Sequence, residues 1–452
     1  MASLSRRRLL QAGSTTFALG AGASAALGAQ GGRGQAKAAN TEVIAGGLGL
    51  KPDSPDDQSA VMQAAINKAI AQRQVLMLPA GSYRVKRLKI TGPLSLVCTP
   101  GGARLVRCGD GPLLSLSGTS IYLRNLTLDG GDIAADGPII RAEAVSDLIF
   151  DRLTVARSRG GGASLTRCSG TVSECRFSDI ADTALFALDS AGLEIARNII
   201  SNIGNNGIQV WRSETGEDGT KVAENRISNV RADKGGSGQN GNGINVFRAG
   251  SVTVSNNRVT DCAFSAVRVN AGSNTQIIGN SCERLGEVAL YAEFGFQGAV
   301  ISDNLVDTAA LGISITNFNH GGRLAVCSGN LIRNLFTRAE GESRGVGIAV
   351  EADAAITGNV VEKAPRAGIM VGWGRHQRNV AVTGNMVRDA RWGIAASVSP
   401  GAGRVLIGQN MLADCSEAAI IGHQNGRGVT ADLAKAEVAD VPVNLTIAGN
   451  AV

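Results

Sequence analysis

The sequence is poor in aromatic residues, in histidine and in long apolar runs. Aromatic residues make up 4% of its 452 residues, and it contains three His and eight Cys. No apolar run of about 18 residues occurs after residue 38, so we expect no membrane-spanning helix there. No Cys or His residues have the spacing of a metal site, and we expect neither a metal nor another cofactor.

Residues 1–38 have the composition of an export signal rather than of a folded segment. The run from Ser5 to Leu10 matches the twin-arginine motif, an Ala- and Gly-rich stretch follows, and Ala36 to Ala38 is a suitable cleavage site. We therefore predict export by the twin-arginine machinery to the periplasm or the medium. The leader holds five of the 44 basic residues and no acidic one, which leaves 39 basic against 38 acidic residues. This near neutrality argues against nucleic acid as a partner.

One short phrase recurs from residue 198 to the C-terminus. It consists of an Ile, Val or Cys, two further residues, an Asn, one residue and another apolar residue, mostly at intervals of 23 to 29 residues. A period of this size is typical of a solenoid, whose units are too small to bury their own apolar face and stack on their neighbours. The repeated Asn residues are Asn198, Asn225, Asn257, Asn280, Asn304, Asn330, Asn359, Asn385, Asn410 and Asn450.

A second phrase follows most of these Asn residues by about ten positions, as in Gly207 to Val210 and Gly312 to Ile315. Its apolar residues two apart indicate a strand, and its Gly supplies a turn. Leucine-rich repeats have an overlapping period, but their Leu framework is absent and the second strand argues against a helix in each unit. We therefore predict an all-β fold, a right-handed parallel β-helix that occupies residues 85–452 as one domain.

Residues 39–84 form a different segment, which we interpret as the N-terminal cap. Asp56 and Asp57 precede an Ala-rich run from Ser59 to Gln72 whose apolar residues share one helical face. The sequence LPAGSY follows at residues 78–83. A solenoid end exposes its core and unpaired backbone, so we expect the helix to cover that end.

These motifs carry a resemblance to known families. The order of Asp56-Asp57, a helix and LPAGSY resembles the start of the pectate-lyase superfamily of right-handed parallel β-helix proteins. The twin-arginine leader joined to the later Gly-Asn and Gly-Ile repeats resembles a family of twin-arginine-translocated bacterial repeat proteins of unassigned activity. The resemblance covers nearly the whole chain and implies the fold, but one fold hosts many functions.

The repeated Asn residues are expected to be structural. Asn in the same register of successive units can stack at a turn and hydrogen-bond the backbone and each other. Cys282 and Cys327 take the places of Val306 and Ile356 in other units. These are inward positions, where Cys behaves as a small hydrophobe. We therefore look for function where the units differ.

The units differ most on the outward side of the second strand, where side chains of successive units stack about 4.8 Å apart. Inserted segments flank this strand, including 213–220 and 317–323 after it and 233–241 and 335–344 before it. All three His (His320, His376 and His423) follow it closely, as do Phe294 and Phe296. We predict a groove there whose aromatic and polar side chains suit sugar rings. The predicted substrate-binding residues are Gln209, Trp211, Arg212, Asn245, Arg248, Asn270, Asn317, Trp373 and His376.

Arg residues gather beside this predicted groove. Because Arg binds carboxylates bidentately, we predict an anionic polysaccharide, such as one that contains uronates. In a lyase or epimerase, Arg268 would neutralise the uronate carboxylate, and Tyr291 or His320 would move the proton beside it. In a glycoside hydrolase, Glu293 and Glu351 would act as a pair two units apart, about 9.6 Å, which is near the upper limit for inversion. We prefer the first chemistry.

The motifs of two known enzyme groups are absent. We find neither the paired Asp with His-Gly and Arg-x-Lys of polygalacturonases nor the Asp cluster that binds calcium in pectate lyases. The run from Asp129 to Asp132 is isolated, and turn chemistry explains it better than a metal site. A non-catalytic carbohydrate-binding or structural protein of the cell envelope is therefore the alternative.

Overall fold

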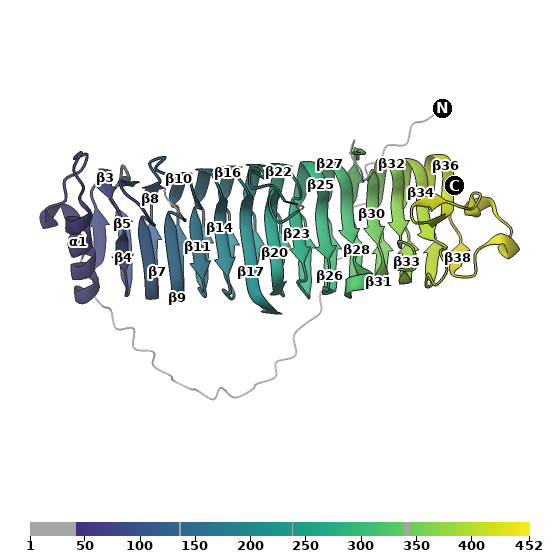
Figure 1. The fold of residues 1–452 in the computed structure, drawn as a ribbon, viewed down its shortest axis with the longest axis horizontal. Helices are drawn as coiled ribbons and strands as arrows, with labels where there is room; N and C mark the ends of the chain where they lie inside the picture. Colours follow the sequence, from purple (N-terminus) through teal and green to yellow (C-terminus); the bar gives the residue numbers. More distant parts are fainter. Residues whose placement is uncertain (1–41, 135–136, 237, 339–343) are drawn as a thin grey trace, which may run out of the picture. The chain divides into compact units, whose positions relative to one another are not determined.

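A computed structural model describes residues 42–134, 137–236, 238–338 and 344–452. In this part the chain winds into a solenoid of parallel strands that lie side by side from coil to coil (Figure 1). The prediction of an all-β parallel solenoid is confirmed. No helix in the described residues is long and apolar enough to cross a membrane. The predicted leader, residues 1–38, lies outside the described residues.

Each complete coil contributes three strands, which form three stacks that we name A, B and C. Stack A follows the repeated Asn and contains β3 (Gly81–Val85), β6 (Ala103–Arg107), β8 (Leu126–Asp129), β10 (Thr154–Ser158), β13 (Arg176–Ile180), β16 (Ile199–Ile203), β19 (Arg226–Val230), β22 (Arg258–Cys262), β29 (Leu331–Arg333) and the first parts of β25 (Ser281–Glu293), β27 (Leu305–Ile315), β32 (Val360–Val371), β34 (Met386–Ser397) and β36 (Met411–Gln424).

Stack B is the second predicted strand of each unit. It contains β4 (Leu88–Ile90), the first parts of β7 (Leu114–Arg124) and β9 (Ile140–Asp151), β11 (Ala163–Thr166), β14 (Thr183–Leu188), β17 (Asn206–Glu217), β20 (Asn242–Gly250), β23 (Val267–Asn270), β30 (Val346–Val350) and the second parts of β25, β27, β32, β34 and β36.

Stack C precedes the repeated Asn. It contains β1 (Glu42–Ile44), β2 (Val75–Leu78), β5 (Leu94–Cys98), the second parts of β7 and β9, β12 (Gly170–Ser173), β15 (Glu194–Ala196), β18 (Lys221–Ala223), β21 (Thr253–Ser255), β24 (Thr275–Ile278), β26 (Gln297–Ser302), β28 (Arg323–Ser328), β31 (Ala352–Thr357), β33 (Arg378–Thr383), β35 (Val405–Gly408) and β38 (Leu445–Ala448).

The repeated Asn residues form a continuous hydrogen-bonded ladder at the turn between stacks C and A. The Oδ1 atom of Asn225 accepts hydrogen bonds from the backbone N (3.0 Å) and Nδ2 (2.9 Å) of Asn198, and the same pattern continues to Asn450. The Nδ2 atom of Asn225 also donates to the carbonyl of Ile195 at 2.9 Å. The predicted structural role of these Asn residues is confirmed.

The interior of the solenoid is filled by the inward residues of all three stacks, chiefly Ile, Val, Leu and Ala. Cys282 and Cys327 are both fully buried among them, as predicted, and all eight Cys of the chain are unpaired in the structure. Small residues at the corners allow the coils to approach. At Gly312, for example, a Cβ atom would lie 2.5 Å from the carbonyl oxygen of Gly347 in the next coil.

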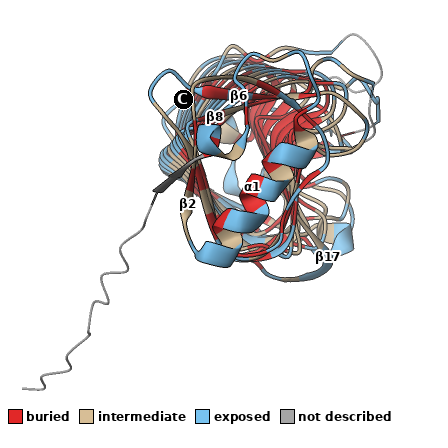
Figure 2. Ribbon diagram, turned by 90° about the vertical axis from the view of Figure 1, so that its left-hand side faces the viewer, coloured by how far each residue is buried: buried red, intermediate tan, exposed pale blue. Residues whose placement is uncertain are grey.

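Helix α1 (Ser59–Gln72) lies across the N-terminal end of the solenoid, with its buried face toward the strands (Figure 2). Met62, Ile66 and Ala69 of this face are buried in the main core, so the predicted capping helix is confirmed over the predicted residues. The short 3-10 helix η1 (Ala45–Leu48) precedes it. Strands β1 and β2 and most of β3 lie within residues 39–84 and already pair with the stacks, so parallel pairing extends upstream of residue 85.

The C-terminal coils carry a second apolar cluster on the outside of stack B. It includes Met370, Trp392 and Ile421, all nearly inaccessible to solvent. The hairpin of β36 and β37 (Arg427–Gly428) folds over this cluster, and Gly428 packs against Ile421 and Trp392. The 3-10 helices η3 (Leu433–Lys435) and η4 (Val438–Asp440) follow.

Candidate functional site

Two columns of outward side chains run along stack B in the predicted register. Gln209, Asn245, Arg268 and Tyr291 occupy one column, because each is the direct strand partner of the next. Trp211, Phe247, Asn270 and Glu293 occupy the neighbouring column in the same four coils. Strand alternation therefore places the predicted residues of these coils on one outer face.

Aromatic rings form a half-buried platform at the N-terminal end of these columns. The Trp211 ring centroid lies 5.5 Å from that of Phe186 and 5.4 Å from that of Phe247. The Trp211 indole donates a hydrogen bond to Asn245 Oδ1 at 3.2 Å, and the Arg248 guanidinium lies 4.8 Å from the centre of the Phe247 ring. Such rings offer apolar faces to a sugar, with polar groups beside them.

Two other predicted binding residues border this platform. Arg212 is half-buried, and its Nε atom has no hydrogen-bond partner among the described residues. Gln209 is buried, and its Oε1 atom accepts a hydrogen bond from Thr183 at 3.0 Å. Gln209 is therefore engaged within the protein rather than open to solvent.

Arg268 and Glu293 point outward but are not exposed, which corrects the prediction of an open groove at this point. Arg268 Nε and Glu293 Oε1 form an ion pair at 2.5 Å, with 11% and 3% of the two side chains exposed. Asn270 donates a second hydrogen bond to the same oxygen at 3.1 Å. The cause is the inserted segment before β20, since a Cβ atom on Gly238 would lie only 1.3 Å from Arg268 Nη1.

Two ionisable residues that the sequence analysis missed complete this cluster. Glu287 is 7% exposed, and its Oε1 atom accepts a hydrogen bond from Arg344 at 2.9 Å. Arg344 comes from the inserted segment before β30, far away in sequence. A buried Glu such as Glu287 in β25 has no signal in a single sequence, because its partner is brought to it only by the stacking of coils.

We call the group of Arg268, Glu287, Tyr291, Glu293 and Arg344 the ionisable cluster. The pKa values of two of its members are raised. Burial raises the pKa of the Glu293 carboxyl, although Arg268 opposes that rise. Burial also raises the pKa of the Tyr291 phenol, and the charges of Glu293 and Glu287 add to the rise. Two buried atoms, Arg268 Nη1 and Glu287 Oε2, have no hydrogen-bond partner among the described residues.

Glu351 and Asn317 lie farther along the same face, and their side chains accept hydrogen bonds from backbone N–H groups. Glu351 Oε2 accepts a hydrogen bond from the backbone N–H of Phe318 at 2.6 Å, and burial raises the pKa of its carboxyl. Asn317 Oδ1 accepts one from the Phe294 N–H at 3.3 Å. The exposed His320, in the 3-10 helix η2 (Phe318–His320), packs its ring edge to face on Phe294, with the ring centroids 5.4 Å apart.

The remaining predicted residues are not gathered at this cluster. Trp373 and His376 form an isolated β-bridge after β32, three coils beyond Glu293, and 46% of Trp373 is exposed. His423 and Phe296 are fully buried, so their predicted place in an open groove is wrong. His423 Nδ1 accepts a hydrogen bond from the Gly426 N–H, and its Nε2 lies 3.3 Å from the Val371 carbonyl.

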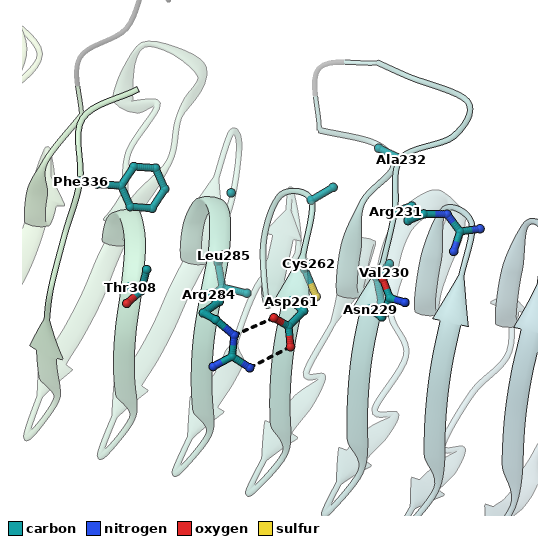
Figure 3. Close-up of a pocket in the computed structure, with 12 residues that line it drawn as sticks. Asn229, Val230, Arg231, Ala232, Asp261, Cys262, Arg284, Leu285, Thr308 and Phe336 are labelled. Atoms are coloured by element: carbon teal, nitrogen blue, oxygen red, sulfur yellow. Dashed lines mark hydrogen bonds and ion pairs between the residues drawn. The ribbon is translucent and has the colours of Figure 1, made fainter. Parts of the chain in front are cut away.

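A cleft of about 530 Å³ crosses the corner between stacks A and B (Figure 3). Arg231 and Ala232, which follow β19, lie on one side of it, and Phe336, which follows β29, lies on the other. Residues of the intervening coils form its floor, including Cys262, Ala263, Leu285, Gly286 and Thr308. Glu287 directly follows Gly286, so the cleft borders the ionisable cluster.

The stacked parallel coils, the Asn ladder and the capping helix define a parallel β-solenoid with an outer face rich in functional groups. Residues 102–227 and 214–387 match the family model "Right handed beta helix region". These matches span more than half of the chain, and the protein belongs to the right-handed β-helix family. No curated protein matches the sequence.

Solved structures share the fold at low identity. The N-terminal fragment of bacteriophage phi29 gene product 12 is 13% identical, with a TM-score of 0.51 over 84% of this chain and 68% of that one. The A-module of the mannuronan C-5 epimerase AlgE6 of Azotobacter vinelandii is 13% identical, with a TM-score of 0.42 over 90% and 98%. A mannuronic-acid-specific polysaccharide family 6 lyase from human gut microbiota is also 13% identical, with a TM-score of 0.48 over 87% of this chain and 90% of that one. At these identities only the fold is shared.

Proposed function

We propose that this protein is exported by the twin-arginine pathway and binds an acidic polysaccharide on the outer face of stack B, where it acts as a lyase or epimerase. The observation that carries the proposal is the ionisable cluster. Five ionisable side chains of three coils are gathered under two inserted segments, and two of their buried polar atoms have no partner in the described part of the chain.

Such a cluster is costly for a solenoid that could place apolar residues there. Burying ion pairs seldom adds stability, and a buried polar atom without a partner costs about 1 to 3 kcal/mol. In the C-terminal coils the same face is instead covered with apolar side chains, among them Met370, Trp392 and Ile421, which avoids this cost in stability. Perturbed ionisable groups that are retained at such a cost are typical of functional sites.

The two unpartnered atoms indicate the chemistry of the ligand. Arg268 Nη1 is a cationic donor and Glu287 Oε2 is an acceptor. A uronate offers both complements on one ring, because its carboxylate accepts from the Arg268 guanidinium and the acidic C5–H beside that carboxylate faces an acceptor that can take its proton. Access to these buried atoms requires the inserted segment at Gly238 to move away from Arg268.

The same residues support β-elimination. Glu287 Oε2 takes the proton from C5 of the uronate while Arg268 neutralises its carboxylate. The C5–H electrons form the C4=C5 double bond, and the C4–O4 bond breaks. Tyr291 donates its proton to the leaving O4, and its phenol is protonated at neutral pH because burial raises a pKa that already lies well above neutral. In an epimerase the C4–O4 bond stays intact, and Tyr291 donates its proton to C5 on the face opposite Glu287 instead.

The geometry favours hydrolysis less. Glu351 lies two strand spacings from Glu293, about 9.6 Å, and its Oε2 atom accepts the Phe318 N–H. An acid engaged by the backbone of a loop of the preceding coil is poorly placed to activate water. The aromatic platform of Phe186, Trp211 and Phe247 supports the non-catalytic alternative, because it binds sugar rings without chemistry.

Incubation of residues 39–452 with alginate, pectate and glycosaminoglycans tests the proposal. A lyase creates new ultraviolet absorbance from the C4=C5 bond, and an epimerase changes the proton NMR spectrum of the polymer without cleavage. Glu287→Gln should lower turnover at least about 100-fold, the usual contribution of an acid or base. Glu224→Gln, at the turn before β19 and with 53% of its side chain exposed, should leave turnover unchanged. Binding without product would support the non-catalytic alternative, and absence of binding would contradict the proposal.

A further inference from the structure

The cleft between the two inserted segments differs in character from the ionisable cluster beside it. Its surface is mainly apolar, and Ala232, Ala263 and Phe336 are the accessible apolar residues that line it. The cluster offers a cation to an acidic sugar, whereas the cleft offers an aromatic ring and small aliphatic groups. The two adjoining surfaces therefore suit different sugar units.

The two Arg side chains of the cleft are already neutralised by the protein. Arg284 Nε and Nη2 donate to Asp261 Oδ1 and Oδ2 at 2.7 and 2.9 Å, and its Nη1 contacts Glu283 (Figure 3). Arg231 donates to both carboxylate oxygens of Asp233, at 2.9 to 3.2 Å. A second uronate carboxylate in this cleft would meet guanidinium groups that carboxylates already engage, and the Asp261 charge would repel it. Arg268 differs, because its Nη1 atom has no hydrogen-bond partner among the described residues.

The sides of the cleft are fixed before any ligand binds. The Phe336 N–H donates to the Ala309 carbonyl at 3.1 Å, and the preceding Leu335 is buried in the main core. On the opposite side the Arg231 N–H donates to the Ile203 carbonyl at 2.8 Å. A preformed apolar cleft with few polar groups is typical of a ligand subsite.

We infer that the cleft binds a neutral sugar unit next to the acidic one, with Phe336 against its apolar face, so that the substrate alternates acidic and neutral sugars. This inference rests on the proposed function. The position of the cleft beside the buried cluster supports it, since Gly286 of the cleft floor directly precedes Glu287, and Glu287 accepts the hydrogen bond from Arg344. A homopolymer of uronates would instead place a carboxylate in the cleft.

Affinities of residues 39–452 for three polymers of matched length test this inference. The probes are hyaluronan, which alternates glucuronate with a neutral N-acetylated sugar, and the homopolymers polymannuronate and polygalacturonate, all at one ionic strength. We expect hyaluronan to bind at least tenfold more tightly than either homopolymer. Equal or tighter binding of a homopolymer overturns the inference and leaves the proposed function standing. Binding of none of them overturns both.

Two substitutions in the cleft sharpen the test. Phe336→Leu keeps most of the apolar volume but removes the ring, and should weaken hyaluronan binding at least fivefold. Phe336→Tyr keeps the ring, and should bind hyaluronan as tightly as the parent protein. Asp261→Asn removes the carboxylate that engages Arg284, and Asn tolerates the left-handed backbone at this position, where φ is 57°. This variant should tighten homopolymer binding at least threefold. Unchanged affinities in Phe336→Leu and Asp261→Asn, with native circular dichroism, would overturn the inference.

Discussion

Replacing Asn304 by Ala removes one rung of the Asn ladder, and the structure gives the size of the loss. Asn304 Oδ1 accepts from the N (2.9 Å) and Nδ2 (3.0 Å) of Asn280, and Asn304 Nδ2 donates to Ile277 O and Asn330 Oδ1, both at 2.9 Å. Asn280 Nδ2 keeps a bond to Val254 O at 3.0 Å, and Asn330 Oδ1 keeps the Asn304 N–H. The backbone N–H of Asn280 is left buried and unpaired, so we expect a destabilisation of about 2 to 4 kcal/mol.

Hydrogen exchange and thermal unfolding of residues 39–452 measure this effect. The Asn280 amide should exchange faster in Asn304→Ala, while the Asn198 amide, four rungs away, keeps its protection because coils of a solenoid interact mainly with their neighbours. Asn319→Ala is the matched control, since Asn319 is exposed and should change stability by less than about 0.5 kcal/mol. Equal stabilities of Asn304→Ala and Asn319→Ala would refute the account of the ladder.

Three further outcomes follow from the sequence and the structure. Arg6 and Arg7 replaced together by Lys should leave a folded protein in the cytoplasm with residues 1–38 attached, as mass spectrometry of cell fractions would show. Arg268→Ala should destabilise the protein by about 2 to 4 kcal/mol in denaturant unfolding, because it leaves the buried Glu293 carboxyl unpaired. Burial lowers the pKa of His423 from 6.5 to about 4. Between these two pH values His423 therefore binds a proton in the unfolded state but not in the folded state. Stability should therefore fall between pH 6.5 and 4 by roughly 3 kcal/mol, and His423→Asn should remove that part of the pH dependence. A pH profile unchanged by this substitution would contradict the buried neutral His.

The fold could be predicted because its causes are local and repeated. Every coil must turn at the same place, so Asn304 and Asn330 recur at the same register and their ladder can be read from their spacing. The helix from Ser59 to Gln72 was equally predictable, since one amphipathic segment breaks the repeat. Stack C was less visible, because its short strands merge with the residues before each Asn.

The candidate site could be predicted only in part. Strand alternation correctly placed Arg268 and Glu293 on the outer face, because alternation depends only on neighbouring residues. The burial of Arg268 depends on Gly238 in an inserted segment of the preceding coil, and the path of such a segment has no periodic signal. His423 was misplaced for a similar reason, since the hairpin that covers it follows it in the chain.

The inserted segments, rather than the repeats, therefore distinguish this face from the rest of the solenoid. They bring Gly238 against Arg268, Arg344 to Glu287, and Phe336 to the cleft, and none of these contacts follows from the repeat register. The coils beneath supply outward side chains at a spacing of about 4.8 Å, close enough for Arg268 and Glu293 of successive coils to pair. A rigid ladder with variable insertions can thus change its ligand through insertion length and composition alone. We accordingly expect exchange of the segment around Phe336 to alter which polymer is bound, while the Asn ladder and the stability that it provides remain unchanged.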